Sequence, residues 1–276
     1  MEKAGGITRR GFLSGSGLAL TAILGASEQA SGQSTAGGGK TNATEALASL
    51  IWDLVAANRI LADQEVLDGY GHVSVRSERD PMRYLLARSM APEMTTADDI
   101  MEYDLDSNPI DGRGRAMHSE RFIHGEIYKV RPEIKSVVHF HAPAVVLMSV
   151  SGEMLRPIYH MAGFIGDGAP LFDIRKASGQ MTNMLISDGA LGRALAQSLG
   201  NKPVALMRGH GAVVVGESLQ QAVGRSVYVK VNAEMQVQAL GKKIEFLEPE
   251  EARLAGIMSD SFPKDWELWK EKAMKR

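Results

Sequence analysis

The sequence of 276 residues contains no cysteine. Disulfides, thiolate metal sites and cysteine nucleophiles are therefore excluded, and any transition-metal site must be built from His, Asp and Glu. Neither sign of charge dominates, because 31 Lys and Arg face 33 Asp and Glu and the formal net charge is −2. This balance gives no reason to expect nucleic acid as a partner. Hydrophobic residues make up 44% of the chain, which is enough for one sizeable buried core.

The N-terminal segment has no apolar run of the length that a bilayer crossing takes, about 20 residues. Its mildly apolar stretch, residues 15–26, follows the twin arginine Arg9-Arg10 and precedes the small residues 30–32. This order is typical of a twin-arginine export signal, so we interpret residues 1–32 as such a signal, cleaved near residues 30–33. The alternative is an N-terminus with an accidental arginine pair. The signal predicts a periplasmic or exported protein with no stable membrane span after its removal.

Residues 33–40 (QSTAGGGK) are expected to form a flexible linker, and residues 41–276 one continuous domain. Hydrophobic spacing and turn residues predict strands at 72–76, 83–88, 136–140, 203–207 and 212–215. Helices are predicted at 41–63, 120–130, 188–199 and 218–240, and one more follows the strand 136–140 and continues to residue 150. Ser119 is expected to cap the helix at 120–130, and residues 95–98 carry the capping signal of a further short helix. The C-terminal part is also expected to be helical. Interleaved strands and helices with short connections predict an α/β domain with a mostly antiparallel or mixed sheet.

The arrangement His139-Phe140-His141 is the most informative local pattern. All seven histidines lie between positions 72 and 210. Alternate side chains of a strand point to the same face, so the imidazoles of His139 and His141 can chelate one ion. A pair of half-buried, hydrogen-bonded histidines is the structural alternative.

Two further residues complete a candidate metal site. His210 stands between two glycines at a turn between strands, where the backbone can approach closely and present a third ligand. Glu120 is expected at the start of a helix, where the helix dipole favours a carboxylate. By itself Glu120 would be read as a solvated residue at a helix start.

In combination, these residues resemble the class II aldolase/adducin family. The segment 119–143 (SERFIHGEIYKVRPEIKSVVHFHAP), the later RGHGAVVVG and the Ala-containing helix at 218–240 carry the resemblance, which extends from about Leu47 to Leu240. In that family a Glu after Ser, the two histidines of a His-x-His strand and a later His before Gly bind a divalent metal. The matching residues here are Glu120, His139, His141 and His210.

The resemblance has further implications. It implies a three-layer α/β/α fold with a central, mostly antiparallel sheet, a homotetramer with active sites at subunit interfaces, and a lyase that stabilises an enolate. Nitrogen and oxygen ligands suit Zn or Mn first, and Co or Fe are also compatible. The same resemblance implies that Glu120 acts as acid or base in addition to binding the metal.

The sequence departs from the sugar-phosphate aldolases of the family at their phosphate-binding segments. Their Gly-Asn-Ile/Val-Ser segment is Gly71-His72-Val73-Ser74 here, and their small Thr-Pro-Ser/Thr-Gly-like loop is replaced by residues 88–92 (RSMAP). These changes make the chain more similar to the family's decarboxylases, which act on ring acids with a hydroxyl beside a carboxylate. The expected substrate is therefore a small hydroxy acid, with a hydroxy-carbonyl compound as the alternative.

The expected roles around the metal follow from this resemblance. Arg88 would bind a second carboxylate by a charge-assisted pair, and His160 or His72 would donate a proton unless they are structural. The remaining candidates for substrate binding are Ser89, His118 and Ser119. His124 either faces the pocket or pairs with Glu120, Tyr159 is a weaker candidate, and Tyr128 is expected to pack behind its helix.

Three function classes fit the sequence to different degrees. A metal-dependent decarboxylase is favoured slightly over an aldolase that cleaves a non-phosphorylated or sugar-derived substrate. A non-catalytic module resembling the adducin head is less favoured, since it need not keep the four ligands. A metalloprotease is disfavoured because Glu120 and His124 do not form a His-Glu-x-x-His helix.

Overall fold

The structure, a computed structural model, describes residues 38–275. The expected export signal at 1–32 and most of the expected linker lie outside these residues. Helix α1 begins at Gly38, so residues 38–40 of the expected linker belong to the first helix. Within residues 38–275, no helix combines the length and apolar character that a membrane crossing requires.

The elements alternate along the chain much as predicted. The strands are β1 (His72–Arg76), β2 (Arg83–Ala87), β3 (Ile100–Asp104), β4 (Ser136–Phe140), β5 (Leu171–Phe172), β6 (Val204–Met207) and β7 (Gly211–Gly216). The α-helices are α1 (Gly38–Asp63), α2 (Phe122–Val130), α3 (Pro143–Met148), α4 (Ile174–Ser178), α5 (Gly189–Leu199), α6 (Leu219–Gln238), α7 (Pro249–Ser259) and α8 (Pro263–Met274). Short 3₁₀ helices are η1 (Pro92–Met94), η2 (Ala97–Asp99) and η3 (His160–Ile165).

The strands form one seven-stranded sheet in the order β3-β2-β1-β4-β7-β6-β5. All pairs are antiparallel except β5 with β6. The mostly antiparallel sheet expected from the short connections is thereby confirmed. The central pair β4 and β7 is in register from Ser136 opposite Gly216 to Phe140 opposite Ala212, which places His139 opposite Val213.

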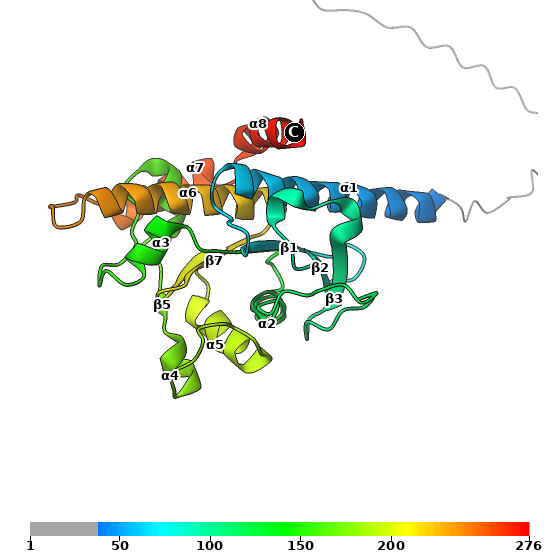
Figure 1. Ribbon diagram of the computed structural model, residues 1–276. Coiled ribbons are helices and arrows are strands. Elements are labelled where there is room, and N and C mark those ends of the chain that lie inside the picture. The colour runs from blue at the N-terminus through cyan, green and yellow to red at the C-terminus, as the bar shows by residue number, and fades with distance from the viewer. Residues whose placement is uncertain (1–37, 276) are drawn as a thin grey trace, which may run out of the picture. The chain divides into compact units, whose positions relative to one another are not determined.

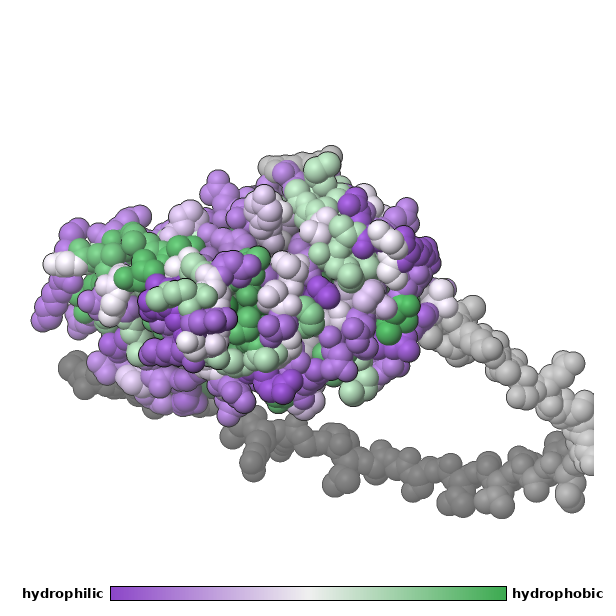
Figure 2. Space-filling view, turned by 60° about the horizontal axis from the view of Figure 1, so that its bottom comes forward, coloured by the Kyte–Doolittle hydropathy of each residue, from purple (hydrophilic) through white to green (hydrophobic). Residues whose placement is uncertain are grey.

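Helices cover both faces of the sheet, so the three-layer α/β/α architecture is confirmed (Figure 1). Figure 1 shows α1 and α6 on one side of the strands and α2 and α5 on the other. Each face of the sheet has its own hydrophobic core, and successive strand residues pack in opposite ones. Val138 packs in the core with α1 and α6, whereas Val137 packs in the core with α2 and α5. Figure 2 shows hydrophilic residues over most of the displayed face, with hydrophobic residues in separate patches.

Capping residues stand at several helix starts, close to the positions where the sequence predicts these helices to begin. The side chain of Asp188 accepts a hydrogen bond from the Leu191 N–H, and the side chain of Ser218 accepts one from the Gln221 N–H. Thr96 and Asp99 form a capping box at η2. Each cap satisfies a backbone donor that the helix itself leaves unpaired.

The start of α2 differs from the prediction. The helix begins at Phe122, and Arg121 stands at the N-cap position with no side-chain cap, so Ser119 is not a cap and Glu120 lies in the preceding turn. The cause is a long-range contact, because the Glu120 carboxylate accepts a hydrogen bond from the Ile186 N–H at 2.9 Å. This contact turns the carboxylate toward the segment before α5 instead of toward the first turn of α2.

Candidate metal centre

Four side chains from three separate segments converge at the end of the central strands. Glu120 lies before α2, His139 and His141 lie at the end of β4, and His210 lies in the turn between β6 and β7. One ligand atom from each lies within 4.8 Å of the others. Glu120 Oε2 is 3.5 Å from His139 Nε2 and 3.4 Å from His210 Nε2. The structure therefore brings together all four predicted metal ligands.

The hydrogen bonds of the histidines select the nitrogen that faces this centre. His139 Nδ1 lies 3.0 Å from the Ala212 carbonyl oxygen, and His141 Nδ1 lies 3.3 Å from the Asp68 carboxylate. Both partners can only accept, so each Nδ1 carries the proton and each Nε2 presents a lone pair. Metal-binding histidines commonly donate such a hydrogen bond from the ring nitrogen that does not bind the metal, because this bond fixes the tautomer and the ring orientation.

The two Nε2 atoms of His139 and His141 are only 3.0 Å apart. Because each ring carries its proton on Nδ1, no proton lies between the two Nε2 atoms. Two lone pairs at this separation repel each other. A cation removes the repulsion by accepting both lone pairs, and the Glu120 carboxylate adds a negative charge. Three imidazoles and one carboxylate, with no thiolate, match the ligands that Zn²⁺ or another divalent transition metal accepts. The donor set therefore fits one divalent ion.

Asp68 was not among the predicted site residues, yet it supports His141. Its Oδ1 accepts hydrogen bonds from the backbone N–H groups of Tyr70 and Gly71, at 2.8 and 2.9 Å. Burial raises the pKa of Asp68, but these donors and His141 outweigh the burial and lower the pKa overall. An ionised Asp68 is thus held beside the Nδ1 edge of the His141 ring.

Replacing Asp68 by Asn is expected to weaken metal affinity about 10- to 100-fold, the usual cost of losing such a supporting contact. The amide is nearly isosteric, so the fold should be unchanged while the charge behind His141 is lost. Isothermal titration of the metal-free protein with Zn²⁺ measures the effect. Asp106→Asn, at an exposed carboxylate paired with Lys129, is the matched control and should bind as the parent does. Equal affinities for the two variants would refute a role of Asp68 in metal binding.

The turn that carries His210 depends on its flanking glycines. Gly209 has a φ of 65°, in the left-handed region that glycine adopts without a steric penalty. A Cβ on Gly211 would lie 2.0 Å from the Phe140 carbonyl oxygen. His210 Nδ1 is buried and has no hydrogen-bond partner among residues 38–275. The backbone of the turn is therefore what places this ring.

We expect Gly211→Ala to lose at least about 3 kcal/mol of unfolding free energy, because backbone, not a flexible side chain, occupies the space of the new methyl group. Chemical denaturation followed by circular dichroism measures this loss. Gly69→Ala is the matched control, since a Cβ there meets nothing within 4 Å. Similar stabilities for the two variants would contradict the close approach of Gly211 to β4.

Glu120 is buried, with 6% of its surface exposed. Burial raises the pKa of the Glu120 carboxyl group, but its electrostatic interactions with the neighbouring His139 and His210 outweigh burial and hold the pKa well below the usual range. The carboxylate is therefore anionic, with Oε1 on the Ile186 N–H and Oε2 toward the two imidazoles. Ile186 was missed in the sequence because a backbone donor leaves no signal in residue type.

Six of the seven histidines form one connected cluster. Ring centroids lie 4.7 Å apart for His139 and His141, 4.9 Å for His139 and His210, and 5.2 Å for His72 and His139. His72 is in turn 4.5 Å from His118 and 4.8 Å from His124. Burial lowers the pKa values of His72, His118 and His124, that of His118 to about 4. These three rings are therefore neutral at physiological pH.

The predicted substrate-binding residues lie beside this cluster. The Ser89 N–H donates to the Ala116 carbonyl at 2.8 Å, which joins the segment after β2 to the segment before Glu120. His118 is buried against His72, whereas Ser89 and Ser119 are exposed. Arg88 forms a salt bridge from Nε to Asp99 at 2.6 Å and keeps 38% of its side chain exposed. A carboxylate bound by Arg88 would therefore share the guanidinium with Asp99.

His160 lies outside the cluster of six. It is exposed at the first residue of η3, where its ring lies edge-on to that of Tyr159, with the centroids 6.0 Å apart. Tyr128 is buried as expected, but its hydroxyl also bonds to Ser74 at 2.8 Å. His124 does not pair with Glu120, and its ring nitrogens instead contact His72 and Ser74.

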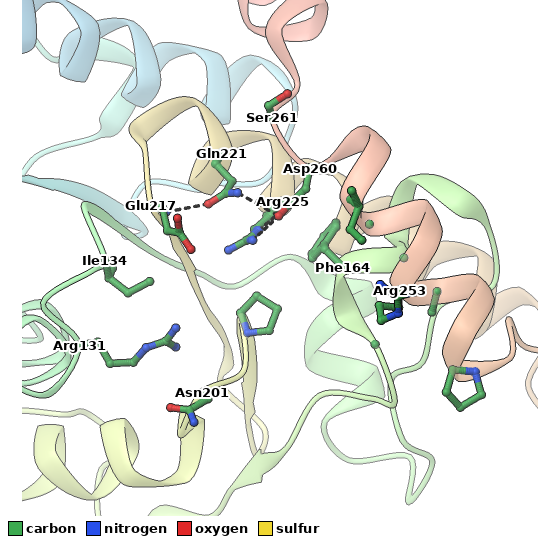
Figure 3. A pocket seen from close by; sticks show the side chains of 17 residues that line it. Arg131, Ile134, Phe164, Asn201, Glu217, Gln221, Arg225, Arg253, Asp260 and Ser261 are labelled. Atoms are coloured by element: carbon green, nitrogen blue, oxygen red, sulfur yellow. Dashed lines mark hydrogen bonds and ion pairs between the residues drawn. The ribbon is translucent and has the colours of Figure 1, made fainter.

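A cavity lies at the end of β4 and β7 that is opposite the four candidate metal ligands (Figure 3). It measures about 550 Å³, and none of the six clustered histidines lines it. Figure 3 shows Arg225 and Asp260 paired across it, with Gln221 beside Glu217. Its lining carries three arginines and two carboxylates but no histidine, and it offers no ligand set for a metal, so size alone does not mark the reactive site.

Known proteins resemble this chain in both sequence and fold. Residues 53–237 match the family described as Class II Aldolase and Adducin N-terminal domain. The chain is 35% identical over 240 residues to a protein named decarboxylase tropJ from Talaromyces stipitatus, covering 78% of this chain and 90% of that one. It is 33% identical over 203 residues to a 3,4-dihydroxyphthalate decarboxylase from Arthrobacter keyseri, covering 67% and 76%.

Solved structures share the fold at lower sequence identity. An aldolase II superfamily protein from Pseudomonas syringae gives a TM-score of 0.69 at 20% identity, over 82% of this chain and 92% of that one. An L-fuculose 1-phosphate aldolase from Glaciozyma antarctica gives 0.68 at 20% identity, over 82% and 88%. The chain therefore belongs to the class II aldolase and adducin family and is a lyase of that family.

Proposed function

We propose that the protein is a divalent-metal-dependent decarboxylase of a small aromatic or heteroaromatic acid that carries a hydroxyl beside the carboxylate. The observation that supports this most strongly is the convergence of Glu120, His139, His141 and His210 within 4.8 Å. Three relatives above 30% identity carry decarboxylase names, and two of these names specify a dihydroxylated aromatic acid. A hydroxyl and a carboxylate on adjacent carbons form the bidentate ligand that such a centre favours.

A bound divalent ion would supply a Lewis acid that stabilises negative charge on the substrate oxygens. The chain's own residues perform the remaining tasks. Arg88, half-exposed beside the site, attracts the carboxylate of the incoming acid. The neutral, buried imidazoles of His72 and His118 exclude water while offering hydrogen bonds. When CO₂ leaves, the electron pair stays on the ring carbon, and a proton must reach that carbon from Glu120 or His72.

Cleavage of a non-phosphorylated or sugar-derived hydroxy-carbonyl substrate is the alternative reaction of the same centre. It needs the same stabilisation of an enolate, and solved aldolases share the fold. His72 stands where the sugar-phosphate aldolases have Asn, which favours a substrate without phosphate. A binding module of the adducin type would not need the four ligands and is the least favoured candidate.

The reaction is tested by incubating the metal-loaded protein with hydroxylated aromatic carboxylic acids and, separately, with aldols. We expect CO₂ release from at least one ring acid with adjacent hydroxyl and carboxylate groups, and no aldehyde release. Isomers with the hydroxyl in the para position serve as controls, because they cannot chelate. Aldehyde release alone would establish the aldolase, and no turnover of any compound would favour the binding module.

Assembly, metal and location are further parts of the proposal. We propose a homotetramer, on the family resemblance and on the exposed apolar side chains Met154 and Leu171, which line a cavity of about 220 Å³. Zn or Mn is the proposed metal, with Co or Fe also compatible with the ligands. Export through the twin-arginine pathway is proposed from Arg9-Arg10 and the apolar residues that follow.

A further inference from the structure

We infer that a buried hydrogen-bonded chain of Tyr128, Ser74 and His124 fixes which ring nitrogen of His72 carries its proton. The inference rests on the proposed function, since it assigns His72 the task of accepting a proton from the substrate hydroxyl. His124, Ser74 and Tyr128 are then positioning residues that act through His72 and never touch the substrate.

Counted with His72, the hydrogen-bonded chain consists of four side chains on two neighbouring elements. His72 and Ser74 alternate on β1 and share the face toward α2, which carries His124 and Tyr128. His72 Nδ1 lies 2.7 Å from His124 Nε2, His124 Nδ1 lies 2.6 Å from Ser74 Oγ, and Ser74 Oγ lies 2.8 Å from the Tyr128 hydroxyl. Each of these groups can donate or accept, so the three bonds alone allow two opposite directions.

A backbone carbonyl at the far end selects one direction. The Tyr128 hydroxyl donates to the carbonyl oxygen of Lys135 at 3.4 Å, and a carbonyl can only accept. With the Tyr128 proton on this carbonyl, Ser74 donates to Tyr128, His124 Nδ1 donates to Ser74, and His72 Nδ1 donates to His124 Nε2. Every proton of the chain has an acceptor in this arrangement, and His72 Nε2 is left with a lone pair.

Burial keeps this arrangement from being exchanged for hydrogen bonds to water. His72 is 3% exposed, Tyr128 is 1% exposed, and Ser74 and His124 are fully buried. The Ser136 hydroxyl donates to the Ser74 carbonyl oxygen at 2.8 Å and fixes the backbone there. A polar group left unpaired in such a place gains no hydrogen bond from water in exchange, so the fully paired direction is favoured over any broken one.

The consequence for the reaction lies at the other nitrogen of His72. Its ring is 5.2 Å from that of His139 and 4.5 Å from that of His118, and Nδ1 is engaged by His124, so Nε2 is the nitrogen left for a substrate. A bare Nε2 accepts a proton from a hydroxyl, whereas a protonated Nε2 could only donate. Both decarboxylation and aldol cleavage need the hydroxyl proton to be accepted.

The test is the ring ¹⁵N spectrum of the metal-free protein, in which protonated and bare imidazole nitrogens have distinct shifts. The His72 signals are assigned by their loss in His72→Gln. We expect His72 to be protonated at Nδ1 in the parent. In Tyr128→Phe, Ser74 loses its acceptor and turns its hydroxyl to His124 Nδ1, which reverses the chain and moves the His72 proton to Nε2.

Tyr103→Phe is the matched control, because it removes a buried tyrosine hydroxyl of the same core that donates to the Met101 sulfur and takes no part in the hydrogen bonds to His72. It should leave the His72 spectrum unchanged. Ser74→Ala, which cuts the chain in the middle, should give a mixture of both His72 tautomers. An unchanged His72 spectrum in Tyr128→Phe, or a proton on Nε2 in the parent, would overturn the inference.

Turnover provides the second readout once a substrate is found. Tyr128→Phe should lower kcat about 10²-fold, the lower range for losing acid–base assistance, with KM within about twofold and metal content unchanged. A purely structural role would instead lower stability without moving the His72 proton. If no compound is turned over, the proposed function fails, while the ¹⁵N result still decides whether the chain sets the tautomer.

Discussion

Glu120→Gln is expected to lower kcat by about 10²- to 10⁴-fold, even at saturating metal, because it removes both the proposed carboxylate ligand and the proposed acid–base group. The substitution preserves shape, and the amide oxygen can still accept the hydrogen bond from the Ile186 N–H. Its amino group, however, can only donate toward His139 and His210. Steady-state CO₂ release, with metal content measured on the same sample, gives the result.

Glu126→Gln is the matched control for this change. Glu126 is also buried, at 4% exposure, but it pairs with Lys129 and Arg193 away from the metal ligands. The control should lose stability while kcat stays within about twofold of the parent. If Glu120→Gln keeps full turnover, or if both variants lose turnover equally, Glu120 has no specific role in the reaction.

His139→Asn is expected to have the second large effect, on metal binding. The Asn amide can replace Nδ1 as donor to the Ala212 carbonyl, but it has no atom at the position of Nε2. Binding free energies of about 10–16 kcal/mol for four-ligand zinc sites imply about 10²- to 10³-fold weaker binding when one ligand is lost. Competition with a chromogenic chelator measures the affinity.

His139→Gln is the counterpart, since its longer side chain can present an oxygen near the position of Nε2 while losing the donor to Ala212. We expect an affinity between those of the parent and His139→Asn. His124→Asn, which changes a fully buried histidine outside the ligand set, should bind metal nearly as the parent does. If His139→Asn binds as tightly as the parent, His139 is not a ligand.

The parts of the site that depend on short-range pattern could be predicted from the sequence. Alternation along a strand was enough to place His139 and His141 on one face, and glycines on both sides of His210 indicated its turn. Asp68 and Ile186 were missed for one physical reason. Their contacts with His141 and Glu120 span 73 and 66 positions, and neither a lone Asp nor a backbone N–H leaves a local pattern.

The fold shows the same division between local and long-range causes. The helix starts predicted at 188 and 218 lie within one residue of the observed starts, where the side chains of Asp188 and Ser218 cap the helices within three residues. The start of α2 was placed too early, since the contact of Glu120 with Ile186 overrides the local capping signal of Ser119. Strand β3 was missed because charged residues interrupt it, and β5 because it has only two residues.

Metal stoichiometry is the most direct measurement of whether one cation joins Glu120, His139, His141 and His210. The metal-free protein is dialysed against a small excess of Zn²⁺ or Mn²⁺, and bound metal per chain is determined by elemental analysis. We expect one ion per chain in the parent and none when the four side chains are replaced together by Gln and Asn. No ion in the parent, or one ion retained by the fourfold variant, would contradict the site.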